Sequence, residues 1–282
     1  MPRFGRKWLF TFLIIIVGMY MYYGNRTIEV TSMDIHSSKI PPSFNGYKIV
    51  QLSDIHDSKF GEHHSDVIEK VVNVEPDAIF ITGDLIDRNR YDLEQSLDLV
   101  NGLKDIAPIY YVTGNHEIST NDQLHIQEEL TRLGVHVLSD EFMLIENAYG
   151  ERMLIGGIED PLNSVLEDEE ATRISLNKTF NDASDRVFKI LLAHRPEQFE
   201  VYVDYDIDLI FSGHTHGGQI RLPFIGGVFA PGQGWFPTYL SGHYEKQETQ
   251  MIVSRGLGNS VIPIRLFNQP EIIVVTLQVN KE

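Results

Sequence analysis

The fold of this 282-residue chain is decided by a short stretch in its first third, Asp77-Ala78-Ile79-Phe80-Ile81-Thr82-Gly83-Asp84-Leu85-Ile86-Asp87. Its continuous apolar run is typical of a strand buried on both faces of a parallel sheet. The run ends abruptly in a glycine followed by a carboxylate. We therefore interpret Ala78 to Gly83 as a buried strand that delivers Asp84 to the edge of the sheet.

Four further segments share this pattern of a strand-like apolar run that ends in a side chain able to bind a metal. They are Lys48 to Ser53 before Asp54, Ile109 to Gly114 before Asn115, Lys189 to Ala193 before His194, and Asp208 to Gly213 before His214. Open α/β sheets bind their ligands outside the carboxyl ends of the strands. Five such endings therefore predict a metal site at one sheet edge, with Asp84 at its centre.

The intervening segments predict helices, because apolar residues recur at helical spacing over 62–74, 92–103 and 122–133. Alternation of this kind indicates βαβ units with right-handed crossovers. Val135 to Ile145 and Arg152 to Ile158 then predict a hairpin. Further helices are expected over 167–180 and 196–203, and further strands over 27–37, 250–255 and 272–279. These pieces predict an α/β fold with two mixed sheets packed as a sandwich and flanked by helices.

The composition limits the classes of function. A hydrophobic content of 42% suits one domain with a substantial core, and the absence of cysteine excludes disulfides and thiolate metal sites. The net charge of -17 argues against nucleic acid as a partner, because phosphate binding needs clustered cations. An anionic substrate would need local positive charge, such as metal ions.

The N-terminus carries a membrane-targeting pattern, in which Arg3, Arg6 and Lys7 precede sixteen uncharged residues, Trp8 to Tyr23. This is shorter than the ~20 residues that span a bilayer, so the segment is either an anchor or the apolar core of a cleaved signal peptide. The tyrosines at its end and the lack of an Ala-x-Ala-like site favour the anchor. We expect an anchor over residues 1–26 and a catalytic domain over 27–282, facing the extracytoplasmic side. The export route stays open.

Five short blocks resemble the signature of the calcineurin-like metallophosphoesterases. They are Asp54-Ile55-His56, Gly83-Asp84-Leu85-Ile86-Asp87, Gly114-Asn115-His116-Glu117, Ala193-His194-Arg195 and Gly213-His214-Thr215-His216. The blocks stand in the family's order across residues 48–216, and the following Gly217 to Pro223 is similar to the membrane-associated branch typified by YaeI and YkuE. The resemblance implies a four-layer α/β/β/α fold and a hydrolase of phosphoesters.

The resemblance also implies a site for two divalent ions. One ion would be held by Asp54, His56, Asp84 and His216, and the other by Asp84, Asn115, His194 and His214. A carboxylate suits the bridging position of Asp84, because it can give one oxygen to each of two ions. Mixed oxygen and imidazole ligands fit manganese, zinc or iron, without choosing among them.

We expect four residues near the ligands to have roles of their own. By resemblance, His116 is the proton or hydrogen-bond donor to the leaving oxygen, with a supporting role as the alternative. Arg195 either contacts a substrate phosphate or forms a structural ion pair. Glu117 orients a ligand or caps the following segment, and Asp87 satisfies backbone groups or orients a ligand histidine.

The function expected is that of a membrane-anchored metal phosphoesterase in which a metal-bridging hydroxide attacks phosphorus in line. The alternatives are a nucleotide pyrophosphatase or general phosphodiesterase, and a non-catalytic metal-binding scaffold of the same fold. Only three residues separate Tyr23 from Thr27, and an aromatic-rich stretch, 224–244, follows the last block. Both features favour a phosphoester carried by a membrane lipid or an envelope polymer. Sequence alone does not separate mono-, di- and pyrophosphate esters, and it leaves the oligomeric state open.

Overall fold

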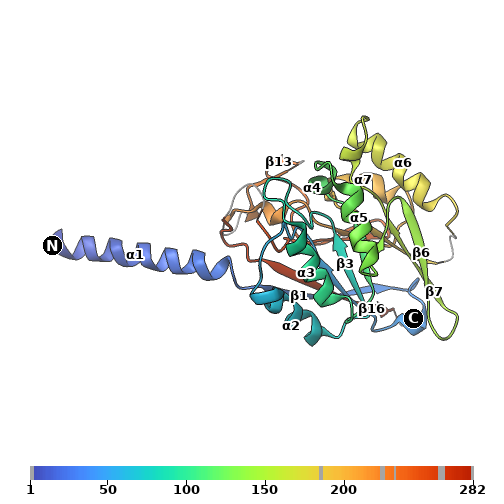
Figure 1. Cartoon of the computed structure of the whole chain (residues 1–282), viewed down its shortest axis with the longest axis horizontal. Helices are drawn as coiled ribbons and strands as arrows, with labels where there is room; N and C mark the ends of the chain where they lie inside the picture. Colours follow the sequence, from blue (N-terminus) through green and yellow to red (C-terminus); the bar gives the residue numbers. More distant parts are fainter. Residues whose placement is uncertain (1–2, 184–186, 223–225, 232, 260–263, 281–282) are drawn as a thin grey trace.

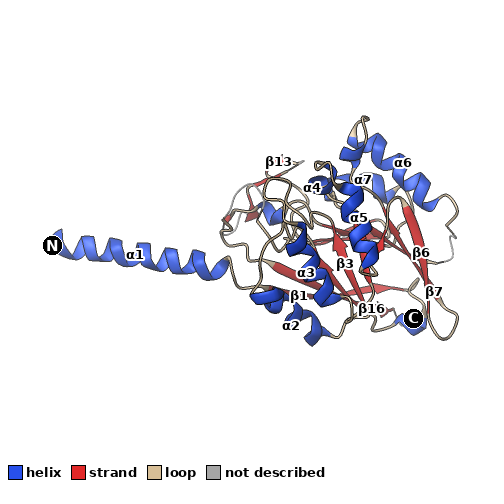
Figure 2. Ribbon diagram, viewed as in Figure 1, coloured by secondary structure: helices blue, strands red, loops and turns tan. Residues whose placement is uncertain are grey.

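Two six-stranded sheets form the centre of the molecule (Figures 1 and 2). The computed structural model describes residues 3–183, 187–222, 226–231, 233–259 and 264–280. In the first sheet the order of strands is β1 (Glu29–Ser37), β16 (Glu271–Val279), β2 (Lys48–Leu52), β3 (Ala78–Thr82), β4 (Ile109–Val112) and β5 (His136–Val137). Strands β2 to β5 run parallel, and β16 pairs antiparallel with β2.

The second sheet is built on the same plan. Its order is β14 (Gly242–Lys246), β15 (Thr249–Val253), β9 (Leu209–Ser212), β8 (Phe188–Leu192), β7 (Arg152–Gly157) and β6 (Glu141–Glu146). The four central strands are parallel, and the edge strands β14 and β6 are antiparallel to their neighbours. Both sheets therefore present the carboxyl ends of parallel strands at their middle, where ligands bind in such sheets.

The sheets pack face to face and helices cover their outer faces. Phe80 of β3 and Phe211 of β9 meet edge to face between the sheets, with ring centroids 5.0 Å apart. The outer face of the first sheet is covered by α2 (Ser65–Val74), α3 (Leu93–Leu103) and α5 (Gln123–Arg132), and that of the second by α6 (Asp168–Phe180) and α7 (Phe199–Val203). The predicted sandwich with four α/β/β/α layers is confirmed.

Shorter elements fill the ends of the sandwich. They are α4 (Asn115–Ile118), the hairpins β10–β11 (Arg221–Leu222, Gly226–Gly227) and β12–β13 (Phe229–Ala230, Gly234–Trp235), and 3-10 turns at Pro42–Phe44, Glu62–His64, Pro161–Asn163, Pro196–Gln198 and His216–Gly218. The five strands predicted to carry ligands are all present, as β2, β3, β4, β8 and β9.

The prediction of one strand over Val135 to Ile145 is wrong. His136 and Val137 extend the first sheet beside β4, whereas β6 begins at Glu141 and pairs with β7 in the second sheet. The chain changes sheets between them, where Asp140 adopts a left-handed backbone with φ 55°. Apolar residues stand on both sides of the short polar crossing Ser139-Asp140-Glu141 because both sheets need them, so the wider pattern does not separate the two strands.

The predicted N-terminal segment lies in α1 (Arg3–Gly24), which projects away from the domain in Figure 1. Its described apolar side chains are exposed, with Trp8 at 66% and Ile14 at 56%. Within the part of the chain that the structure describes, no helix combines the length and the apolarity needed to cross a bilayer, so the predicted transmembrane helix is not supported.

Candidate metal centre

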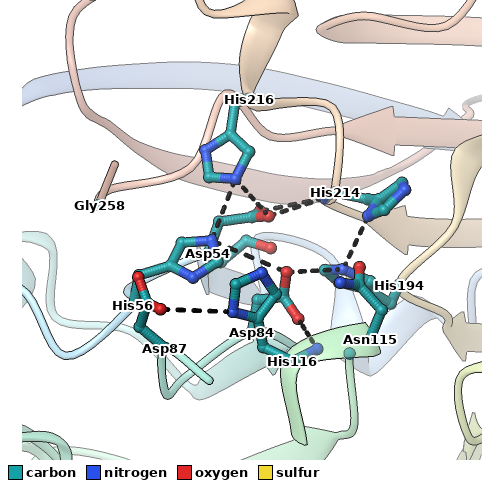
Figure 3. Close-up of polar contacts among 12 residues, drawn as sticks. Asp54, His56, Asp84, Asp87, Asn115, His116, His194, His214, His216 and Gly258 are labelled. Carbon is teal, nitrogen blue, oxygen red and sulfur yellow. Dashed lines mark hydrogen bonds and ion pairs between the residues drawn. The ribbon is translucent and has the colours of Figure 1, made fainter. Parts of the chain in front are cut away.

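Loops at the carboxyl ends of five strands bring all seven predicted ligands together (Figure 3). Asp54 and His56 follow β2, Asp84 follows β3, Asn115 begins α4 after β4, His194 follows β8, and His214 and His216 follow β9. Six of these side chains belong to buried residues, and Asn115 is half-buried. Buried polar groups of this density need partners or an ion to offset the cost of leaving water.

Six of these side chains form two groups, Asp54 with His56 and His216, and Asp84 with His194 and His214, in which the ligand atoms lie within 4.8 Å of one another; His56, Asp87 and His116 form a third such group. In the first group, His216 Nε2 lies 3.0 Å from His56 Nε2 and 3.4 Å from Asp54 Oδ1. In the second group, His194 Nε2 lies 3.3 Å from Asp84 Oδ2 and 3.2 Å from His214 Nδ1. Nitrogen and oxygen lone pairs that converge in this way are suited to hold a cation.

Asp84 lies between the two groups. Its Oδ2 faces His194 of the second group and is also 3.7 Å from His56 Nε2 of the first. Its Oδ1 accepts a hydrogen bond from the backbone N–H of His116 at 2.8 Å, which fixes the carboxylate plane. This is the position that a bridging carboxylate requires, and bridging itself stays a prediction.

The protonation chemistry of the donors fits divalent ions, because histidine must be neutral to bind a metal. Burial lowers the pKa of His56 to about 3 and lowers the pKa values of His214 and His216 well below the usual range. Burial also opposes the charged form of His194, but the charges of Asp84 and Asp54 outweigh it and raise its pKa to about 10. The carboxylates of Asp84 and Asp54 therefore favour a positive charge at the centre of the site.

Two further polar atoms in the site are also arranged to bind a metal ion. The buried Asn115 Oδ1 has no hydrogen-bond partner among the described residues, as expected of a metal ligand. His194 donates from Nδ1 to the carbonyl oxygen of Thr82 at 2.8 Å, which directs Nε2 at the second group, where a metal ion would take the place of the Nε2 proton. Hydrogen bonds of this kind set the tautomer of metal-binding histidines.

The backbone at the site is unusual. Five of the predicted ligands, Asp54, His56, Asp84, His214 and His216, adopt left-handed φ angles between 49° and 69°. Such conformations cost residues other than glycine about 1–3 kcal/mol each and gather at functional sites. Glycine at position 114 makes room for the cluster, because a Cβ atom there would collide with Asp84 Oδ1.

His116 lies beside the first group, with its ring centroid 4.4 Å from that of His56. The backbone N–H of Arg88 donates to His116 Nδ1 at 3.1 Å, so the proton of the neutral ring is on Nε2. Burial lowers the pKa of His116 and keeps the ring neutral near pH 7. Asp87 Oδ1 is 3.9 Å from Nδ1, yet the Asp87 carboxylate also accepts from the N–H of Asn89 and from Arg90, which is the backbone role predicted as one alternative.

Glu117 holds the loops that carry the ligands. Its buried carboxylate accepts from the backbone N–H groups of Asp84 at 3.0 Å, Ile86 at 3.0 Å and Gly114 at 2.7 Å. Burial and the nearby charge of Asp84 raise its pKa to about 7. Glu117 thus fixes the Asp84 loop and also caps α4, so both predicted alternatives hold for it.

Arg195 is engaged in a structural ion pair. Its Nε lies 2.7 Å from Asp160 Oδ2 and its Nη2 lies 2.9 Å from Asp160 Oδ1, in a bidentate arrangement. Nη1 is 3.3 Å from Asp168. Of the two alternatives left open by the sequence, this geometry favours the ion pair over contact with a substrate phosphate.

Sequence analysis missed Arg265, a fully buried residue next to the first group. Its Nη2 lies 3.4 Å from His216 Nδ1, and its Nη1 donates to the carbonyl oxygen of Arg255 at 2.8 Å. Asn268 supports the same histidine by donating to its carbonyl oxygen at 2.6 Å. Both residues lie about fifty positions after the last signature block, in a stretch without motif, and no local pattern marks them.

Comparisons with known proteins agree with this geometry. The sequence profile of the family described as calcineurin-like phosphoesterase matches residues 47–218. The chain is 36% identical to the uncharacterized metallophosphoesterase YkuE of Bacillus subtilis, over 93% of this chain and 89% of that protein. It is 29% identical to the phosphodiesterase YaeI of Escherichia coli, over 82% of each.

Two further matches are more distant in length or sequence. A bovine transmembrane protein with metallophosphoesterase domain is 33% identical over 88% of this chain, which spans 57% of that protein. The solved structure of TT1561 from Thermus thermophilus superposes with a TM-score of 0.51 at 12% identity, covering 74% of this chain and 88% of that one. That structural likeness concerns the fold alone.

Proposed function

Because the chain belongs to the calcineurin-like phosphoesterase family and is a hydrolase of phosphoesters, we propose that it works with two divalent ions held by the two ligand groups. The observation that carries the proposal is the position of Asp84, whose Oδ2 faces both His56 and His194. In this proposal Asp54, His56, Asp84 and His216 hold one ion, and Asp84, Asn115, His194 and His214 hold the other.

The reaction proposed is hydrolysis without a covalent enzyme intermediate. Two ions bound here would supply a hydroxide nucleophile and neutralise the charge of the phosphoryl group. The role of the chain is to hold its ligands rigidly and to donate a hydrogen bond. His116 is suited to this donation, because its Nε2 carries the proton while Nδ1 accepts from the Arg88 N–H. We place the leaving oxygen of the substrate at His116 Nε2.

A measurement of metal content together with activity tests the proposal. The full chain is loaded in turn with manganese, zinc and iron, and hydrolysis of bis(p-nitrophenyl) phosphate and p-nitrophenyl phosphate is followed. We expect two equivalents of metal and activity that disappears with a chelator and returns with metal. A fully loaded chain that hydrolyses neither ester would instead support the non-catalytic scaffold.

We further propose that α1 attaches the domain, residues 27–282, to a membrane from the extracytoplasmic side, and that the substrate is linked to a lipid or an envelope polymer. The exposed apolar side chains of α1 support attachment. Trp235 of β13 and the neighbouring Phe236 are 71% and 72% exposed, and β13 lies in the half of the domain from which α1 extends in Figure 1. Exposed aromatic residues of this kind suit a membrane interface.

A further inference from the structure

The end of α1 is fastened to a loop that also reaches the metal centre. Asn25 Nδ2 donates to the carbonyl oxygen of Arg265 at 2.9 Å, and the Arg265 N–H donates to Asn25 Oδ1 at 2.6 Å. The ring of Tyr20 packs on Phe267, with centroids 5.1 Å apart. At its other end, the Arg265 side chain approaches His216. The residues that follow α1 are therefore held in a defined position beside the metal centre.

A cavity of about 450 Å³ lies at this junction. It is lined by residues from three segments, Asn25 and Arg26, Ser58 to Gly61 with Asp66, and Leu257 to Asn259. Its volume is within the range of about 300–1,000 Å³ typical of small-molecule sites. The cavity can therefore hold a group of the size of a lipid headgroup.

One wall of the cavity, Leu257 to Asn259, is hydrogen-bonded to the backbone that carries Asp54 of the first ligand group. The N–H of Gly258 donates to the carbonyl oxygen of Asp54 at 2.7 Å, and that of Leu257 donates to Ser53 at 3.0 Å. Figure 3 shows Gly258 beside His216 and Asp54. A ligand in the cavity is thus a neighbour of the metal centre and separate from it.

The lining carries excess positive charge in an acidic chain. Arg26 and Lys59 face a single carboxylate, Asp66, whereas the chain as a whole has a net charge of -17. The Arg26 guanidinium lies 4.4 Å from the ring centroid of Tyr22. Among the described residues neither cation forms an ion pair. Both are therefore available to bind an anion.

We propose that this cavity binds a second phosphate group of a lipid substrate, while the two ligand groups receive the scissile phosphoester. The inference rests on the proposed function, because it takes hydrolysis to occur at the metal centre and α1 to lie in the membrane. Arg26 is the third residue after Tyr23, so with α1 in the membrane the cavity opens at the level of the headgroups. The ligand class is a phospholipid with two phosphates in its headgroup.

Two lipids that differ by one phosphate test the subsite. The full chain is reconstituted in phosphatidylcholine vesicles, and hydrolysis of bis(p-nitrophenyl) phosphate is inhibited with phosphatidylglycerol phosphate or with phosphatidylglycerol. Two charge-assisted contacts should make the lipid with two phosphates inhibit at a concentration about tenfold lower. The double variant Arg26→Gln/Lys59→Gln should lose this preference.

The matched control is Lys70→Gln/Lys104→Gln, which removes two exposed or half-buried cations that do not line the cavity and should keep the preference. Equal inhibition by the two lipids, or a preference that survives in Arg26→Gln/Lys59→Gln, would overturn the proposal. Inhibition by free inorganic phosphate at the same concentration that is lost in Arg26→Gln/Lys59→Gln would show that the lipid is not the source of the anion. If the chain hydrolyses nothing, the proposed function fails, and the amounts of phosphatidylglycerol phosphate and phosphatidylglycerol that stay bound to the detergent-purified full chain and to Arg26→Gln/Lys59→Gln then decide on the subsite.

Discussion

At the scale of single residues, the site depends on Asp84, because its Oδ2 lies within 4 Å of imidazole nitrogens of both ligand groups, 3.7 Å from His56 Nε2 and 3.3 Å from His194 Nε2. Replacement by asparagine keeps the shape and the oxygen that accepts from the His116 N–H, but it removes the charge shared by the two ions. We expect Asp84→Asn to lose bound metal and to lower kcat at least about 10³-fold, since a metal supplies several kcal/mol of transition-state stabilisation.

Metal analysis by mass spectrometry and hydrolysis of bis(p-nitrophenyl) phosphate measure both effects. The control is Asp98→Asn, which removes one carboxylate from the exposed pair with His63. That variant should retain metal and activity. Two equivalents of metal in Asp84→Asn would show that the carboxylate does not bridge.

His116 is expected to act without binding metal. Its Nδ1 is occupied by the Arg88 N–H, which leaves Nε2–H as the donor. Replacement by phenylalanine should keep the metal content and lower kcat by about 10²–10⁴-fold, the range for an acid or base group. The two readouts separate the roles, because a fall in metal content together with activity would identify His116 as a ligand or a structural residue.

At the scale of elements, the recurring unit is a buried strand, a glycine and a ligand. Gly114 is the clearest case, because its backbone is not left-handed and the need for glycine is steric alone. A methyl group there would collide with the Asp84 carboxylate. We expect Gly114→Ala to fold, with a melting temperature lowered by several degrees, and to lose metal affinity by at least about tenfold, as for other substitutions that displace metal ligands.

Thermal unfolding followed by circular dichroism, together with metal titration, measures the two quantities. Gly24→Ala is the control, because no atom lies within 4 Å of the added methyl group. Unchanged metal affinity in Gly114→Ala would show that the Asp84 loop moves freely and that the close approach of the two loops is not required.

The unit of a buried strand, a glycine and a ligand explains which parts of the fold and of the site could be predicted from the sequence. Apolar runs such as Ala78 to Thr82 are long enough and apolar enough to mark strands, and their endings mark the ligands. The crossing near Asp140 was missed because the residues on both sides are apolar for two different sheets. Arg265 acts through contacts with residues far along the chain, and such contacts leave no periodic pattern.

At the scale of the whole molecule, α1 stands apart from the domain (Figure 1) and exposes a helix rich in large apolar side chains, including Trp8, Leu9, Phe10 and Phe12. Exposed apolar surface of this extent is costly in water and marks an interaction site. The end of the helix is tied to the domain through Tyr20 and through Asn25, the residue that follows α1. In our proposal a membrane covers these apolar side chains.

This arrangement predicts where the protein is found in cells and which change releases it. Full-length protein should sediment with membranes after a high-salt wash and dissolve in detergent, and protease added to cells stripped of their wall should digest the domain. Ile14→Asp/Ile16→Asp places two charges at exposed positions on different sides of α1, where each costs about 2.5–3.5 kcal/mol in a bilayer core, and should move most of the protein to the soluble fraction. Val72→Asp/Leu124→Asp adds the same charge at exposed positions of the domain and should stay with the membrane. If both double variants sediment alike, attachment to the membrane does not depend on α1. The proposed position of the cavity at Arg26, at the level of the membrane headgroups, is then also wrong.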